Sequence, residues 1–463
     1  MSEPLGVVET AAAITSGELS ATAATEEALA RIEERDGALN AFSVVLREQA
    51  LAEAAERDVA QTAGEELGPL HGVPIAIKEE LDVAGTVTTF GGLANSTPVA
   101  EDGEVVRRLR AAGAVIIGKT TMPEFGAFPF TESDALGVTR NPWDTRHSPG
   151  GSSGGTAAAV AAGMVPAGIG GDGGGSIRIP SACCGLFGLK PQRGRVSQAP
   201  HTDLWFTLGT TGPLTRSVRD SAVIYDVIRG SLPSDTYHAG ETGSFVEAAA
   251  REPGRLRIGW TTKPVTLGVR PDPRHVAAVH ETVQLLTDLG HDVREVDPKY
   301  PDPTVAFVPQ FLGGIRAEST MMEHFDRLEK RTRETYRIGS WVTPRVIDVA
   351  LRATEKVSRK ANRVFDEVDV LLTPTQPHRP ARTGILMGTG TVRASLRALP
   401  AISYVALWNL AGNPAASVPR GLADDGLPLA VQLVGRTDDE PTLLSLSAQI
   451  EAASPWPLVA PRD

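Results

Sequence analysis

Cysteine is nearly absent: the 463-residue chain has two, Cys183 and Cys184, and they are adjacent. A disulfide between neighbouring residues would be strained, so the chain is not a disulfide scaffold. Two adjacent thiols without distant partners also make a poor metal site, and no other metal-ligand spacing appears. We therefore expect two small buried thiols in a reducing compartment, and neither a metal nor a cofactor.

Long apolar runs and basic clusters are missing too. No segment contains the about 18 consecutive apolar residues that a membrane-spanning helix needs. Residues 1–8 lack a basic stretch followed by an apolar run, so no secretory leader is expected. The net charge of -11 is spread along the chain, which disfavours nucleic acid and anionic membranes as partners. These absences predict a cytoplasmic protein.

Apolar patterns in the sequence predict an alternation of strands and helices. Hydrophobic residues make up 41% and charged residues 22%, as in soluble globular proteins, and no linker or repeat divides the chain. Strands are expected at 73–77, 114–117, 165–169, 256–260, 293–296, 368–373, 415–418 and 429–434, with a short one near Phe42 and Val44. Helices are expected at 21–34 (capped by Ser20), 47–60, 102–112 (capped by Asp102), 157–162, 273–289 and 440–451, and over much of 304–365. The expected fold class is α/β, with a mixed sheet flanked by helices.

A glycine-rich loop at residues 170–180 contains a serine that suits nucleophilic catalysis. Ser176 follows three glycines, whose backbone can approach a ligand closely because no Cβ is present. The candidate donors to a developing oxyanion are the N–H groups of Gly173, Gly174, Gly175 and Ser176. Ser176 is therefore a candidate nucleophile that carries its own oxyanion hole.

Two other uses of this loop have to be weighed. A phosphate-binding loop needs Lys and then Ser or Thr directly after its last glycine, whereas Gly175 is followed by Ser176 and Ile177. The dinucleotide-binding spacing is not reproduced by Gly170, Gly173 and Gly175 either. A nucleotide-binding protein and a non-catalytic protein with a structural turn stay open as alternatives.

The candidate base is a lysine. None of the nine histidines lies in a nucleophile-elbow or triad context. Lysine can replace histidine where burial makes a neutral amine available, which arginine cannot do. Lys78 directly follows the apolar run 72–77, as such a buried lysine should. Glu79 and Glu80 offer ordinary ion-pair partners, so a surface lysine at a strand end is the alternative.

Three segments of this chain occur together and in a characteristic order. They are His-Gly-Val-Pro-Ile-Ala-Ile-Lys at 71–78, Gly-Gly-Ser-Ser-Gly-Gly at 150–155 and Asp-Gly-Gly-Gly-Ser-Ile-Arg-Ile-Pro at 172–180. In these segments, and at 185–191, 212–214, 369–375 and 409–414, the chain resembles the amidase signature family. The spacing between Ser152 and Ser176 also resembles the family pattern. Gly171 and Gly173 depart from it, since many members have hydroxyl or larger residues there.

The resemblance implies a role for each of these residues. Lys78 would be the base, Ser152, in a cis peptide, would relay the proton, and Ser176 would form the acyl-enzyme. Ser153, Asp172 and Arg178 would brace the two loops by hydrogen bonds and ion pairing. The resemblance also implies one amidase domain over residues 1–463, with a catalytic core at roughly 65–230 and a helical insertion at roughly 300–365.

Phenylalanine is concentrated in a segment that passes the active site in that family. Phe125, Gly126 and Phe128 would thus line an apolar pocket. Further candidate walls are Trp205, Phe206, Met321, Met322 and Trp408. The expected small-molecule substrate is an aryl or alkyl amide, anilide or carbamate without strong charge, with some esters.

A rival within the family is the glutamine-hydrolysing subunit of glutamyl-tRNA amidotransferase. That subunit typically has a polar, glutamine-reading stretch before its Asn-Leu-Ala-Gly. Here residues 402–408 are mostly apolar, which favours an amidase. The sequence does not set the oligomeric state, so a homodimer stays open.

Overall fold

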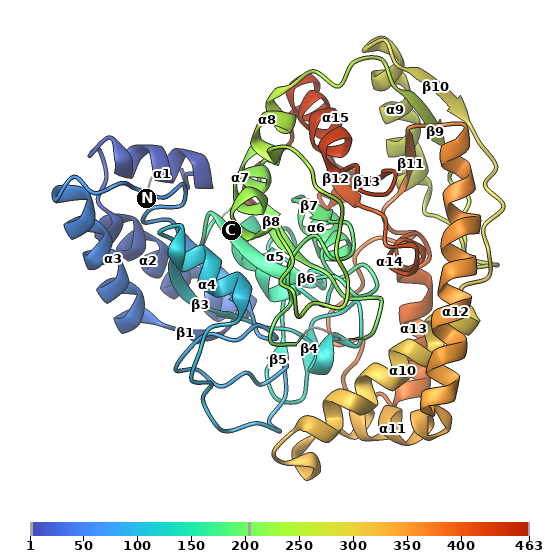
Figure 1. Ribbon diagram of the computed structural model, residues 1–463, viewed down its shortest axis with the longest axis horizontal. Coiled ribbons are helices and arrows are strands. Elements are labelled where there is room, and N and C mark those ends of the chain that lie inside the picture. Colours follow the sequence, from blue (N-terminus) through green and yellow to red (C-terminus); the bar gives the residue numbers. More distant parts are fainter. Residues whose placement is uncertain (1–2, 202–204, 462–463) are drawn as a thin grey trace.

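The computed structural model describes residues 3–201 and 205–461. Within these residues, eleven strands form one sheet in the order β1-β3-β2-β6-β8-β7-β12-β13-β11-β9-β10 (Figure 1). The strands are β1 (Phe42–Val45), β2 (Pro74–Lys78), β3 (Val115–Thr120), β6 (Ala167–Gly171), β7 (Phe187–Lys190), β8 (Thr211–Thr215), β9 (Arg257–Trp260), β10 (Asp292–Glu295), β11 (Val370–Pro374), β12 (Ala415–Leu422) and β13 (Pro428–Val434). A separate hairpin joins β4 (Glu132–Ser133) to β5 (Gly137–Val138).

The sheet is mixed. β3, β2 and β6 run parallel to one another, as do β11, β9 and β10. The other neighbours in the sheet are antiparallel. The predicted α/β fold with a central mixed sheet is confirmed.

Helices cover the sheet and extend to both ends of the molecule. They are α1 (Val7–Thr15), α2 (Ala21–Leu39), α3 (Arg47–Thr62), α4 (Glu104–Ala111), α5 (Gly154–Ala161), α6 (Arg178–Cys184), α7 (Val218–Ile228), α8 (Phe245–Ala250), α9 (Pro273–Asp288), α10 (Thr304–Met321), α11 (Lys330–Ile338), α12 (Pro344–Ala361), α13 (Thr391–Ala401), α14 (Ala406–Ala411) and α15 (Glu440–Ala453). Figure 1 shows α1, α2 and α3 together at one end and α10, α11 and α12 along the opposite side. No helix in the described ranges is long and apolar enough to cross a membrane.

The run that precedes Lys78 is a strand covered on both faces. Ile75 and Ile77 pack into one hydrophobic cluster, whereas Ala76 packs into a second cluster that contains α2 and α5 residues. Successive side chains of a strand point to opposite faces, so a strand between two helical layers needs apolar residues throughout. The continuous apolar run therefore places Lys78 at the end of a central strand.

Some helix boundaries differ from the sequence-based expectation. Ser20 caps α2 as expected, since its side chain accepts a hydrogen bond from the Ala23 N–H at 3.0 Å. The prediction that Asp102 caps the next helix is wrong, because Gly103 is the N-cap of α4. The Asp102 carboxylate instead accepts the Ala84 N–H at 2.8 Å and pairs with Arg110 at 2.8 Å. Asp102 therefore binds these two residues instead of the first N–H groups of α4.

Several elements were not predicted, among them α1, α6, α7, α8, α13 and α14 and strands β7 and β8. The expected strand at 165–169 lies at Ala167–Gly171, so the part of the glycine-rich loop that holds Ser176 begins directly at its end. The stretch from 304 to 366 is largely helical, with α10, α11 and α12 joined by short 3-10 turns.

The two cysteines are buried and unpaired, as expected. Burial raises the pKa of the Cys183 thiol to about 12, because the thiolate would lose its hydration. Both thiols are therefore inert at neutral pH.

Candidate active site

Two parallel strands bring the candidate residues to one edge of the sheet. β2 pairs with β6 in a register that sets Ile77 opposite Ile169. Since parallel strands end at the same edge, the last residue of β2 and the loop after β6 lie close together. Lys78 is that last residue, and residues 172–176 form that loop.

Lys78 is buried and joined to the first candidate serine. Its side chain is 1% exposed, and its Nζ donates to Ser152 Oγ at 2.9 Å. Nζ also pairs with Glu80 Oε1 at 3.0 Å, while Glu79 turns away to Lys119 at 3.4 Å. The surface-lysine alternative is therefore excluded, and of the two glutamates Glu80 is the partner of Lys78.

Ser152 is held close to the loop that carries Gly126. The Gly151–Ser152 peptide is cis, and Ser152 is buried. Gly126 has φ +64°, and a Cβ at this position would lie 2.9 Å from Ser152 Oγ. Glycine is thus required at 126, both for the backbone conformation and for the approach of the hydroxyl.

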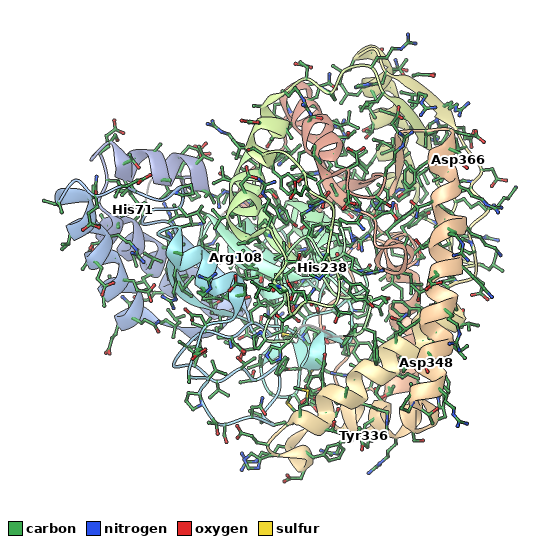
Figure 2. All side chains as sticks on the ribbon, in the orientation of Figure 1. His71, Arg108, His238, Tyr336, Asp348 and Asp366 are labelled. Carbon is green, nitrogen blue, oxygen red and sulfur yellow. The ribbon has the colours of Figure 1, made fainter. Side chains whose placement is uncertain are left out.

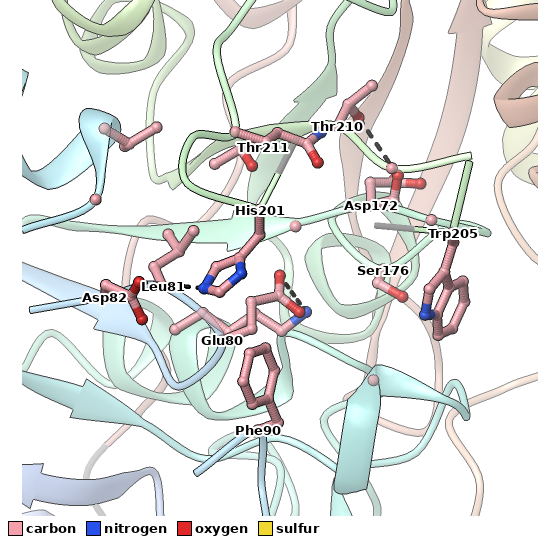
Figure 3. A pocket seen from close by; sticks show the side chains of 18 of the residues that line it. Glu80, Leu81, Asp82, Phe90, Asp172, Ser176, His201, Trp205, Thr210 and Thr211 are labelled. Carbon is pink, nitrogen blue, oxygen red and sulfur yellow. Dashed lines mark hydrogen bonds and ion pairs between the residues drawn. The ribbon is translucent and has the colours of Figure 1, made fainter. Parts of the chain in front are cut away.

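Ser176 reaches the same cavity and is tied to the loop of Ser152 by its neighbour. The Ser153 N–H donates to the Ser176 carbonyl at 3.2 Å, and Ser153 Oγ donates to the Gly171 carbonyl at 3.1 Å. Lys78, Ser152 and Ser176 line one cavity, and Figure 3 shows Ser176 between Asp172 and Trp205. The fold therefore assembles the three residues from segments far apart in sequence.

A buried ion pair supports the loop of Ser176. Arg178 Nε and Nη2 each lie 3.0 Å from an oxygen of Asp172, and both side chains are fully buried. Asn409 Nδ2 donates to Asp172 Oδ1 at 2.8 Å, and Gln432 accepts from Arg178 Nη1 at 2.8 Å. Burial alone would raise the pKa of Asp172, but the Arg178 charge and these hydrogen bonds hold it well below its usual range.

The candidate oxyanion donors are not equivalent. The Gly175 N–H donates to Asp172 Oδ1 at 2.7 Å, so it is already occupied by the group that braces the loop. Among the described residues, the N–H groups of Gly173, Gly174 and Ser176 have no protein acceptor. This corrects the expectation for Gly175 and leaves three candidate donors beside the Ser176 hydroxyl.

Two cavities meet at Ser176. The first is lined by Lys78, Ser152 and several acidic groups (Figure 3). The second has an apolar wall without charged residues among those described. Ser176, Gly126 and Trp205 line both cavities. A ligand that reaches Ser176 can therefore extend into two different surroundings.

The residues expected to form an apolar pocket divide between the two cavities. Phe125 lines the first, Phe128 the second, and Gly126 and Trp205 both. Phe307, Phe311 and Leu396 of the second cavity were not predicted, because α10 and α13 lie far from the serine loops in sequence.

Four other expected wall residues lie elsewhere. Trp408 is packed in the core, with its ring centroid 5.9 Å from that of Phe365. Met321 points largely to solvent, and Met322 packs behind Phe125. Phe206 packs near Gly313 of α10. These predictions are wrong because nearness to a motif in sequence does not fix where a side chain points.

The chain is similar over nearly its whole length to known amidases. The amidase family model matches residues 23–444. The chain belongs to the amidase signature family. AmiB2 of Mycobacterium tuberculosis, a putative amidase by name, is 50% identical over 454 residues, which cover 97% of this chain and 96% of that protein. A glutamyl-tRNA(Gln) amidotransferase component of Synechococcus sp. (strain CC9605) is 37% identical over 471 residues, covering 95% of this chain and 94% of the relative.

Solved structures of the amidase signature family have the same fold. The 6-aminohexanoate cyclic dimer hydrolase is 31% identical, with a TM-score of 0.92 and 98% of each chain covered. A bacterial aryl acylamidase is 27% identical, with a TM-score of 0.89, and 98% of this chain and 97% of that one are covered. This amidase is therefore a hydrolase of the C–N bonds of amides.

Replacing Asp172 should destabilise the amidase because it leaves a buried charge. In Asp172→Asn, Arg178 loses its counter-ion, which we expect to cost about 3–5 kcal/mol in unfolding free energy. The measurement is urea unfolding at neutral pH. The pKa of Asp172 is lowered in the folded state, so its contribution is fully present at neutral pH and is lost only in strong acid.

Asp348→Asn is a matched control for that variant. Asp348 lies on the exposed side of α12 (Figure 2), and its replacement should leave stability nearly unchanged. Equal unfolding midpoints for the two variants would contradict the bracing role of Asp172.

Proposed function

We propose that this amidase works through a Ser176 acyl-enzyme, with Ser152 and Lys78 as the proton relay. The observation that carries the proposal is the buried hydrogen bond from Lys78 Nζ to Ser152 Oγ, at the wall of the cavity that Ser176 also lines. Lysine, unlike arginine, can give up a proton in a protein and so serve as a base.

The relay moves one proton in each direction. Ser176 Oγ attacks the amide carbonyl carbon, its proton passes to Ser152, and the Ser152 proton passes to Lys78. Glu80, 3.0 Å away, stabilises the ammonium so formed. The carbonyl oxygen becomes an oxyanion, which the N–H groups of Gly173, Gly174 and Ser176 face as donors.

Collapse of this intermediate breaks the C–N bond and reverses the relay. The proton returns from Lys78 through Ser152 to the leaving nitrogen, and the amine departs. Water then attacks the acyl-enzyme with the same relay as base, which releases the acid and restores the Ser176 hydroxyl. Because the relay lies in the first cavity, the amine half of the substrate belongs there and the acyl half in the second.

The second cavity supports an apolar acyl group. Phe128, Phe307 and Leu396 contribute to its walls, and Phe307 stacks on Phe311 with ring centroids 6.1 Å apart. Aryl or alkyl amides, anilides and carbamates without strong charge fit these surroundings, and some esters do as well. A free glutamine fits less well, because its ammonium and carboxylate find no charged partner among the described walls of this cavity. This favours a simple amidase over the glutamine-hydrolysing transamidase.

A panel of paired amides, esters and carbamates with acyl groups of increasing length tests the proposal. We expect kcat/KM to rise by roughly threefold to fourfold for each methylene buried in the second cavity. Preferred turnover of glutamine, without any gain from apolar acyl groups, would overturn the amidase proposal in favour of the transamidase.

The exposed rim of this cavity offers a variant that leaves the core intact. Leu396 is 69% exposed, and Leu396→Asp should lower kcat/KM for long apolar acyl groups by about fivefold to tenfold while sparing acetamides. Leu267, which is 96% exposed, supplies the control Leu267→Asp. Equal effects of both variants would place the acyl group elsewhere.

We also propose the setting in which the amidase works. Its net charge of -11 disfavours nucleic acid as a partner and agrees with a cytoplasmic enzyme acting on small molecules. A homodimer is compatible with this setting, and gel filtration with light scattering determines the oligomeric state.

A further inference from the structure

One acidic side chain in the first cavity has no protein partner for one of its oxygens. Glu318, on α10, is 5% exposed and lines the cavity with Lys78, Ser152 and Ser176. Its Oε2 is buried and, among the residues the structure describes, has no hydrogen-bond partner. The side chain does hydrogen-bond to Trp205. A buried polar atom without a partner is costly, so Oε2 marks a place where a ligand atom can bind.

The other acidic groups of this cavity are already engaged. Glu80 pairs with Lys78, Asp172 with Arg178, Glu104 with Arg108 at 2.7 Å, and Asp82 with His201 at 3.1 Å. Figure 3 shows the last of these pairs at the cavity wall. Glu318 differs from these neighbours because it forms no ion pair with any residue that the structure describes.

The surroundings of Glu318 favour its neutral form. Burial raises the pKa of Glu318 well above its usual range, and the charge of Glu80 raises it further. The hydrogen bond with Trp205 and the charge of Lys78 oppose this shift without cancelling it. A neutral carboxyl group that accepts the Trp205 N–H on one oxygen can donate a proton from the other.

We propose that Glu318 donates a hydrogen bond from Oε2 to a carbonyl oxygen in the amine half of the substrate. This inference rests on the proposed relay, which directs the leaving nitrogen and its substituent into the first cavity. Phe90, Phe125 and Trp205 supply apolar surface around that substituent. The favoured substrates thus combine an apolar acyl group with a neutral amine half that bears a carboxamide or a similar acceptor.

Two substrates of nearly the same shape test this selectivity. Both carry a phenylacetyl group, one on glycinamide and the other on isobutylamine, so they share a shape but differ in the acceptor carbonyl and in the basicity of the leaving amine. Release of glycinamide, and not of ammonia, is measured for the first. The wild-type amidase should favour the glycinamide substrate in kcat/KM by about 10-fold to 100-fold, as sites built to hydrogen-bond a substrate group do.

Two substitutions of Glu318 separate hydrogen bonding from charge. Glu318→Gln keeps a donor and an acceptor and should retain most of the preference. Glu318→Leu removes both and should lower the ratio of glycinamide to isobutylamide kcat/KM by about 10-fold to 100-fold. Glu355→Leu, the same substitution at an exposed site on α12, should leave the ratio unchanged.

Each other outcome overturns the inference. An unchanged ratio in Glu318→Leu, or no wild-type preference for the glycinamide, would show that Glu318 does not bind the substrate. A preference for an aminoethyl amide that disappears in Glu318→Gln would show an ionised carboxylate that binds ammonium. If Glu318→Leu does not fold, Glu318→Ala supplies the same comparison, because it also removes both the donor and the acceptor. Absence of any amide hydrolysis by the wild type would instead refute the proposed function.

Discussion

Ser176→Ala should abolish amide hydrolysis, with kcat falling on the order of 10⁴-fold or more. The variant has no hydroxyl to form the acyl-enzyme, so only binding and the oxyanion donors remain. A fluorophosphonate should label the wild-type protein at the peptide that contains Ser176 and should leave Ser176→Ala unlabelled. Peptide mass spectrometry measures both.

Ser16→Ala is a control for this substitution. Ser16 is exposed, and its hydroxyl only donates to the Ala13 carbonyl of α1 at 3.1 Å. It should label and turn over like the wild type. Labelling of a different serine, or full activity in Ser176→Ala, would remove Ser176 from the role of nucleophile.

Lys78→Ala should lower the amide hydrolysis rate by about 10²-fold to 10⁴-fold, the contribution expected of a general acid and base. Ester turnover should decrease less, because an alkoxide leaves with less need of a proton than an amine. The ratio of amide to ester kcat/KM is therefore the informative measurement. A loss smaller than tenfold would make Lys78 a structural residue.

The chain contains a close structural match for this lysine. Lys119, on the neighbouring strand β3, is as buried as Lys78 and pairs with Glu79 at 3.4 Å. Lys119→Ala should lower the unfolding midpoint without changing the ratio of amide to ester turnover. If both variants changed that ratio equally, burial of a lysine rather than the relay would explain the effect.

The central part of the site could be predicted from the sequence because local pattern and order determine it. An apolar run ending in Lys78 predicts a lysine at the end of a covered strand, and a serine after three glycines predicts a hydroxyl near free N–H groups. The fold class followed from the alternation of strand and helix patterns. The pairing of β2 with β6, which brings these residues together, is a tertiary contact that periodicity does not encode.

The remaining features depend on contacts between distant segments. The sequence predicts that the Gly175 N–H donates to the oxyanion, but in the structure this N–H donates to the Asp172 carboxylate. Glu318 lies in a helical stretch without any local signal, and only the packing of α10 against the loops brings it into the cavity. The prediction that Asp102 caps α4 is wrong for the same reason, because the Asp102 carboxylate binds the Ala84 N–H and Arg110 instead.

The division of the site between two parts of the chain affects how new specificities can arise. The proposed relay lies within residues 78–176, whereas Glu318, Phe307 and Leu396 belong to the later segment that contains α10 and α13. On this proposal, mutations in the later segment can alter which amides are accepted while Lys78, Ser152 and Ser176 stay unchanged. Gene duplication followed by change in that segment is thus a short evolutionary route to a new substrate, and recombination between paralogues at these boundaries would follow the same route.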